Sequence, residues 1–228
     1  MAEASLAQAP SPTADSLTDW GREYRGSSAT PGTLAAERIT DRDFVAEFQL
    51  RSSTAVETLL LFADLGLVSK RDATQWVFPL LIQARGETRR QLYKALLTLG
   101  EPKALLDVAL SAYEKYGNED RLTLAASLLM DLGAHAFPSL RILARSNRPE
   151  CAWFVPTIAG LPDVKLQNRI EVLISLVKSP HIAVRQSLLG ATQALPSPEA
   201  ISLLHLLSQD SNEEIADEAR EYLGNIEA

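Results

Sequence analysis

The sequence lacks several features on which whole classes of protein depend. It contains a single cysteine, Cys151, so no intrachain disulfide can form, which fits a reducing compartment. Its first residues do not combine a basic start with an apolar run of signal-peptide length. No stretch approaches the roughly 18 consecutive apolar residues of a membrane span. We therefore expect a cytoplasmic protein that does not enter the membrane.

Positive charge is also scarce. The formal net charge is −7, with 22 Lys and Arg residues against 29 Asp and Glu residues. Coating a nucleic-acid duplex requires clustered cations that neutralise phosphates. The composition makes nucleic acid an improbable partner.

Motifs for catalysis and metal binding are missing as well. The sequence has no glycine-rich phosphate loop, no HExxH and no cysteine pair at metal spacing. His135, His181 and His205 fall in different predicted helices, whereas a metal site needs three or four convergent ligands. Cys151 begins a predicted helix after Arg148, but no base is indicated beside it, so an inert side chain is expected. We predict no enzyme activity, no catalytic residue, no metal site and no cofactor.

The chain divides by composition into two parts. Residues 1–37 are rich in Ala, Ser, Thr, Gly and Pro and offer few large apolar side chains for burial. We predict a flexible N-terminal tail there, with a short docking helix around Leu17, Trp20 and Tyr24 as the alternative. Residues 38–228 are leucine-rich and form the predicted folded domain.

Helical spacing dominates the folded part. Apolar residues recur at i, i+3, i+4 and i+7, which places them on one side of a helix. Apolar segments close on Leu-Gly at residues 65–66, 99–100, 132–133 and 223–224, on Ala-Gly at 159–160 and on Ala-Leu-Pro at 194–196. The five intervals between the first and last ends average about 32 residues. A glycine just beyond a helix suits the left-handed conformation that satisfies the last carbonyls.

Each interval has room for two helices. The predicted pairs lie in residues 73–100, 102–133, 134–160, 166–195 and 197–226. Residues 52–66 form the second helix of an N-terminal pair, with a partial first helix at 41–51. Pro138 and Pro156 fall inside helical segments and are expected to kink them. The sequence thus predicts an all-α fold, an α-solenoid of about five to six antiparallel helix pairs with a right-handed superhelix.

The last two pairs resemble HEAT repeats, particularly the short type of the phycobilisome-lyase-like proteins. The resemblance rests on LISLVKSPHIAVRQSLLGATQAL and LLHLLSQDSNEEIADEAREYLGNI, about 60 residues in all. Val184-Arg185 and Asp210 stand where that pattern often has Val-Arg and Asp, whereas Ile215-Ala216 departs from it. The resemblance implies an armadillo-like helical scaffold that binds a partner on its concave face, which the second helices line.

A basic stripe is the predicted partner site. Second helices carry the five residues proposed to contact an acidic protein surface: Arg89, Arg90, Lys94, Arg121 and Arg185. The alternative is that these residues are solvated helix charges with local Glu partners.

Two further functions stay open beside a non-enzymatic protein–protein scaffold. One is a phycobilin-lyase-like or chaperone-like accessory to an enzyme or chromoprotein, which needs a deep apolar pocket. The other is a helical-repeat alkylpurine DNA glycosylase, which needs Trp, Asp and Arg on a basic concave face. Trp76, Trp153 and Asp163 are the residues this last hypothesis depends on, and the acidic charge disfavours it.

Overall fold

The computed structural model describes residues 53–227, and every regular element in that range is helical. The all-α prediction is therefore confirmed. The predicted tail of residues 1–37, its alternative docking helix and the predicted helix at 41–51 lie outside the described residues. Within residues 53–227 no helix combines the length and apolarity needed to cross a membrane.

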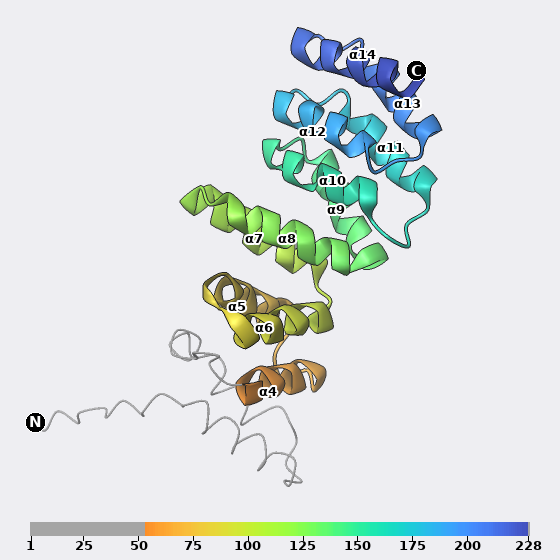
Figure 1. Ribbon diagram of the computed structural model, residues 1–228. Helices are drawn as coiled ribbons and strands as arrows, with labels where there is room; N and C mark the ends of the chain where they lie inside the picture. Colours follow the sequence, from red (N-terminus) through yellow and green to blue (C-terminus); the bar gives the residue numbers. More distant parts are fainter. Residues whose placement is uncertain (1–52, 228) are drawn as a thin grey trace, which may run out of the picture. The chain divides into compact units, whose positions relative to one another are not determined.

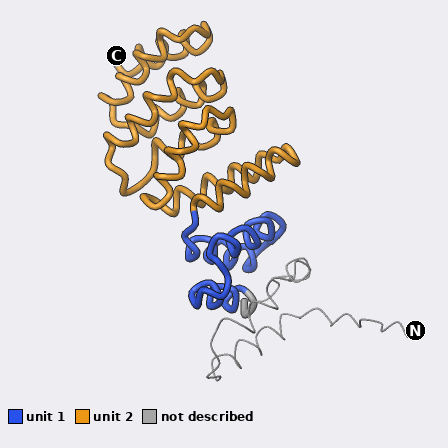
Figure 2. The backbone as a smooth tube through the Cα atoms, turned by 180° about the vertical axis from the view of Figure 1, so that it is seen from behind, with its two compact units in different colours: residues 1–101 blue, residues 102–228 orange. Residues whose placement is uncertain are grey.

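The chain forms two compact units that divide after Glu101 (Figure 2). In unit 1 the described helices are α4 (Ser53–Asp64), α5 (Lys70–Gln83) and α6 (Gly86–Leu99). α5 and α6 pack as a pair, as predicted, and α4 packs against both. Phe78 and Leu81 of α5 are fully buried in this unit and Leu92 of α6 nearly so.

Unit 2 consists of four successive helix pairs (Figure 1). Its elements are α7 (Pro102–Tyr116), α8 (Glu119–Asp131), the 3₁₀ helix η1 (Gly133–Ala136), α9 (Phe137–Arg145), the 3₁₀ helix η2 (Pro149–Phe154), α10 (Val155–Gly160), α11 (Leu166–Leu176), α12 (Ile182–Thr192), α13 (Ser197–Leu207) and α14 (Glu213–Glu227). Along the second helices, α8 contacts α10, α10 contacts α12 and α12 contacts α14. Along the first helices, α7 contacts α9 and α9 contacts α11. The pairs therefore stack as layers, as helical-repeat chains do. The right-handed superhelix stays a prediction.

The prolines of the second layer act differently from the prediction. Pro138 and Pro156 were expected to kink continuous helices, but each stands in the first turn of an α-helix that follows a 3₁₀ segment. A first-turn residue needs no N–H for an intrahelical bond, so proline is tolerated there. Each helix of this layer is consequently a 3₁₀ segment joined to a short α-helix.

Of the five predicted glycine ends, four are confirmed, three of them with the left-handed conformation, and the one at Gly224 is wrong. Gly66, Gly100 and Gly133 have φ values of 71°, 64° and 58°, in the left-handed region that glycine adopts at little cost. Gly224 lies inside α14, which continues to Glu227. Gly160 ends α10 without a positive φ, and a Cβ there would lie 3.3 Å from Met130 Cε. At Gly160 the glycine allows close packing between layers rather than a turn.

Polar contacts join consecutive layers of unit 2 at the turns inside the pairs. Arg148 pairs with Glu114 of the preceding layer, and His181 Nε2 lies 2.9 Å from the carbonyl oxygen of Asn147. Between the last two layers, Arg185 Nε donates to Asp210 Oδ2 at 2.7 Å. This edge thus adds directional contacts to the apolar packing between the layers.

Candidate functional site

The predicted basic residues fall in both units. Arg89, Arg90 and Lys94 lie on α6 of unit 1, where Arg90 Nη1 pairs with Glu87 Oε2 at 3.2 Å. The side chains of this pair are 81% and 67% exposed. Solvent screens such a pair, so it adds little to stability and leaves the charges accessible. Arg90 is therefore a solvated helix charge with a local Glu partner, which is the alternative given for the basic stripe.

Arg121 lies in unit 2, in the first turn of α8. Its Cζ is 5.0 Å from the centre of the Tyr116 ring, and Lys115 Nζ is 5.1 Å from the same centre. The Tyr116 ring is 60% exposed. Both cations therefore interact with an exposed aromatic ring at the turn between α7 and α8.

Arg185 does not belong to an exposed stripe. It is 8% exposed, and its guanidinium donates to both carboxylate oxygens of Asp210, at 2.7 and 3.2 Å. Nη1 also donates to the carbonyl oxygen of Ser179 at 2.6 Å. An arginine whose donors are taken up inside the protein cannot present its charge to a partner. We correct its predicted role to that of a structural residue between the last two layers.

The second helices of unit 2 form one exposed face, which we call the second-helix face. Its side chains come from equivalent positions of successive layers, about 33 residues apart from α8 to α12, and all are exposed. These positions are Asp120, Thr123 and Ser127 on α8, Trp153 on η2, Pro156 and Gly160 on α10, Gln186 and Gly190 on α12, and Asp217 and Glu221 on α14. The face is uncharged in its middle layers and acidic in its first and last.

Charge separates between the first and second helices of unit 2. The exposed carboxylates of the second helices are Glu119, Asp120, Asp131, Glu213, Glu214, Asp217 and Glu221. The first helices carry the exposed cations Lys103, Lys115, Arg141 and Arg145 and only two exposed carboxylates, Glu114 and Glu171. Of the second-helix arginines, Arg121 lies over the Tyr116 ring, Arg185 is buried and Arg220 pairs with Asp217. The exposed charges of the second helices in this unit are therefore mostly acidic, and of the predicted basic residues only Arg121 lies there with part of its surface exposed.

The tryptophan and histidine residues considered for catalysis or metal binding lie on separate helices. Trp76 lies on α5 of unit 1, whereas Trp153 lies on η2 of unit 2 and is 37% exposed. His135 and His205 are exposed on separate helices, η1 and α13. No group of three or more potential metal ligands occurs within the part of the chain that the structure describes.

Cys151 is 1% exposed, and burial raises the pKa of its thiol to about 12. Because the thiolate is the nucleophile, we expect the folded protein to resist alkylation at pH 8. Iodoacetamide labelling followed by mass spectrometry should show a rate at least 100-fold slower than for the protein unfolded in guanidinium, an order-of-magnitude expectation from the pKa and the burial. Rapid labelling of the folded protein would contradict the buried, protonated thiol.

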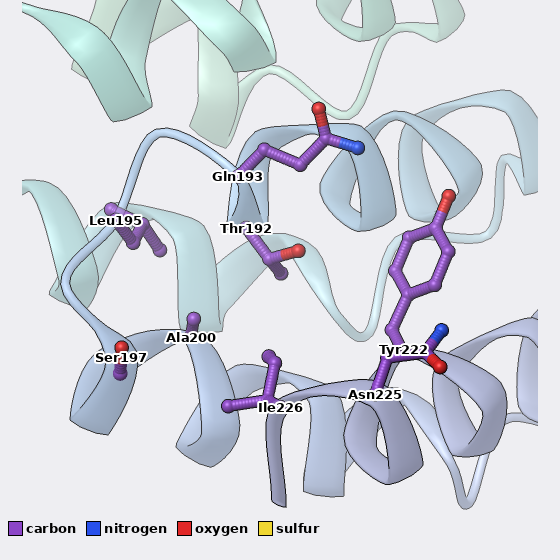
Figure 3. Close-up of a pocket in the computed structure, with 8 residues that line it drawn as sticks. All are labelled: Thr192, Gln193, Leu195, Ser197, Ala200, Tyr222, Asn225 and Ile226. Carbon is purple, nitrogen blue, oxygen red and sulfur yellow. The ribbon is translucent and has the colours of Figure 1, made fainter. Parts of the chain in front are cut away.

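A pocket of about 290 Å³ opens where α12 and α14 end and α13 begins. Its walls include Thr192, Gln193, Leu195, Ala200, Tyr222 and Ile226 (Figure 3). The volume is near the lower limit of roughly 300 Å³ for small-molecule sites. A single long side chain matches this size better than a large cofactor does.

The comparisons with known proteins do not supply a family. No protein-family model matches the chain, and a search of the curated proteins gives no match. The resemblance to HEAT repeats accordingly stays a prediction, and the candidate surfaces rest on the geometry described above.

Sequence reasoning missed two features. The pairing of Arg185 with Asp210 had a signal, because both residues stand at positions of the repeat pattern, but exposure was assumed for the arginine. The pocket had no periodic signal, since it is built from the ends of three helices rather than from one repeated face.

Proposed function

We propose that this protein is a non-enzymatic protein-binding scaffold, built as a HEAT-like array, and that unit 2 binds its partner through the second-helix face. The observation that carries the proposal is the row of equivalent exposed positions on α8, η2, α10, α12 and α14. Such a row offers many small contacts over several layers, which suits an extended protein surface.

Trp153 supplies the anchor that an interface of this kind needs. Its large side chain is 37% exposed, and the neighbouring positions Pro156, Gln186 and Gly190 are uncharged and exposed. Tryptophan is enriched among the residues that dominate binding energy, and the centres of interfaces are poor in charge. The acidic positions of the first and last layers then form a rim that favours a partner with complementary cations.

The test is site-specific photocrosslinking in the cells that make the protein. A photoreactive amino acid at Gln186 should yield a discrete adduct with a partner, whereas the same group at Ser202, exposed on α13, should not. Combining the Gln186 crosslinker with Trp153→Ala should reduce the adduct about tenfold, the size expected for loss of a binding anchor. Thr123→Arg places a long charged side chain on the same face, outside the core, and should independently reduce the adduct.

The control for both substitutions is Ile142→Ala. Ile142 is 65% exposed on the first helix α9, so its removal changes apolar surface away from the second-helix face. Equal adducts at Gln186 and Ser202, or equal losses from Trp153→Ala and Ile142→Ala, would show that the face is not the binding surface.

A further inference from the structure

The pocket between α12, α13 and α14 has two chemically different ends. Leu195, Ala200 and Ile226 supply apolar surface, and the polar tips of Gln193 and Tyr222 point toward the same side of the pocket (Figure 3). Tyr222 donates from its hydroxyl to Glu218 Oε1 at 2.9 Å. A carboxylate therefore stands at the polar end, beside the wall that Tyr222 forms.

Negative potential surrounds that polar end. The hydrogen bond to Glu218 and the charge of the same carboxylate raise the pKa of Tyr222, and the charge of Glu221 adds to the effect. α12 and α14 both end at the pocket, and the negative end of a helix dipole favours a cation. α13 begins there, but it carries Glu199 in its first turn, which offsets the positive end of its dipole.

Cations are almost absent from the surrounding layer. Between Arg185 and the end of the chain the only Lys or Arg is Arg220. Arg220 pairs with Asp217 and donates to the carbonyl oxygen of Ser208. The same segment holds Glu199, Asp210, Glu213, Glu214, Asp217, Glu218, Glu221 and Glu227. Asp217 is thus paired with Arg220, and Asp210 is paired with Arg185. With six further carboxylates and no other Lys or Arg in the segment, the layer is complementary to a basic ligand.

We infer that this pocket receives an arginine or lysine side chain from a basic segment of a partner protein. The alkyl stem lies against Leu195, Ala200 and Ile226, and the cationic head reaches Glu218 and the amide group of Gln193. Long basic side chains bury their stems on apolar surface while the charged head stays at a polar rim. The inference rests on the proposed scaffold function and adds a second contact, separate from Trp153.

The pocket can be tested without a partner. Addition of n-butylguanidinium to the full ¹⁵N-labelled chain should shift the amide signals of Thr192, Gln193, Tyr222 and Asn225 saturably. Neutral n-butylurea, of the same shape, should bind about tenfold more weakly because it lacks the charge-assisted contact. Equal binding of the two probes would overturn the inference.

Matched variants locate the contact. Glu218→Gln should raise the Kd for n-butylguanidinium about tenfold, a size typical for loss of a charged hydrogen-bond partner. Glu213→Gln makes the same change of charge in the first turn of α14, away from the pocket, and should leave the Kd within about twofold. Equal effects of Glu218→Gln and Glu213→Gln would mean that the net negative charge of the layer, and not a contact with Glu218, attracts the probe.

A peptide pair extends the test to the partner class. A fluorescein-labelled octapeptide of Ala and Ser with two central arginines should bind the wild type in a fluorescence anisotropy titration, and the same peptide with citrulline should not. Trp153→Ala should leave this binding unchanged. If the peptide binds but the Gln186 crosslink does not depend on Trp153, the second-helix face alone is refuted. If the crosslink depends on Trp153 but the arginine peptide does not bind, the pocket alone is refuted.

Discussion

Arg185→Ala is expected to lower the free energy of unfolding by about 3–5 kcal/mol, because it leaves the carboxylate of Asp210 without its partner in a desolvated site. The side chains of Arg185 and Asp210 are only 10% and 2% exposed. The carbonyl oxygen of Ser179 also loses its donor, which lies 2.6 Å away. Urea unfolding followed by far-ultraviolet circular dichroism measures the loss.

Hydrogen exchange read by mass spectrometry should place this damage in the last two layers of unit 2. Peptides from α12 to α14 should exchange faster in Arg185→Ala than in the wild type, while peptides from α7 and α8 change less. Arg220→Ala is the matched control, because its pair with Asp217 has side chains 59% and 63% exposed. That change should cost less than about 1 kcal/mol.

The double variant Arg185→Met/Asp210→Leu separates the charge from the packing. Replacing both members of a buried pair with apolar side chains often costs little, whereas removing one member leaves an uncompensated charge. We expect the double variant to recover at least about half of the stability lost in Arg185→Ala. A double variant as unstable as the single one would show that the bond to Ser179, rather than the ion pair, carries the effect.

Phe154→Ala should be about as damaging, with an expected loss of about 3–5 kcal/mol. Phe154 ends η2, has no exposed surface and lies at the junction with α10. Removing a fully buried aromatic ring loses its transfer free energy and leaves a cavity that the layers close only in part. The urea midpoint should fall, while the dependence of the free energy on urea stays near the wild-type value.

The adjacent residue gives a control within the same turn. Trp153→Ala should cost on the order of 1–2 kcal/mol, since the ring is already 37% exposed. Binding should show the opposite order, because Trp153 lies on the proposed face and Phe154 does not. If Trp153→Ala destabilised the protein as much as Phe154→Ala, Trp153 would be a core residue and the proposed anchor would be wrong.

Helix positions followed from the sequence because their causes are local. The i, i+3, i+4 spacing, the cap of Asn118 on Asp120 and the left-handed Gly100 each involve residues a few positions apart. The pairs at 73–100, 102–133, 166–195 and 197–226 appear as α5–α6, α7–α8, α11–α12 and α13–α14.

The second pair of unit 2 shows where local rules become insufficient. Proline has no backbone N–H, so it cannot donate an intrahelical hydrogen bond at its position. Several backbone conformations meet this restriction, including a kinked helix and a new helix that starts at the proline. In this chain the conformation is a 3₁₀ segment before Phe137 and another before Val155. Packing against α8 and α12 selects among the allowed conformations, and sequence periodicity carries no information about that packing.

The role of Arg185 depended on contacts between layers, and this is why its burial was not predicted. Arg185 and Arg89 look alike as helical cations, yet Arg185 turns inward because Asp210, 25 residues later, meets it across the next layer. The amino-acid order was enough to establish helices, their pairing and the acidic composition, since those follow from near neighbours and from counting. Which side chains face solvent, and which helix ends enclose a pocket, depends on the stacking of distant segments, because burial is a property of the assembled layers.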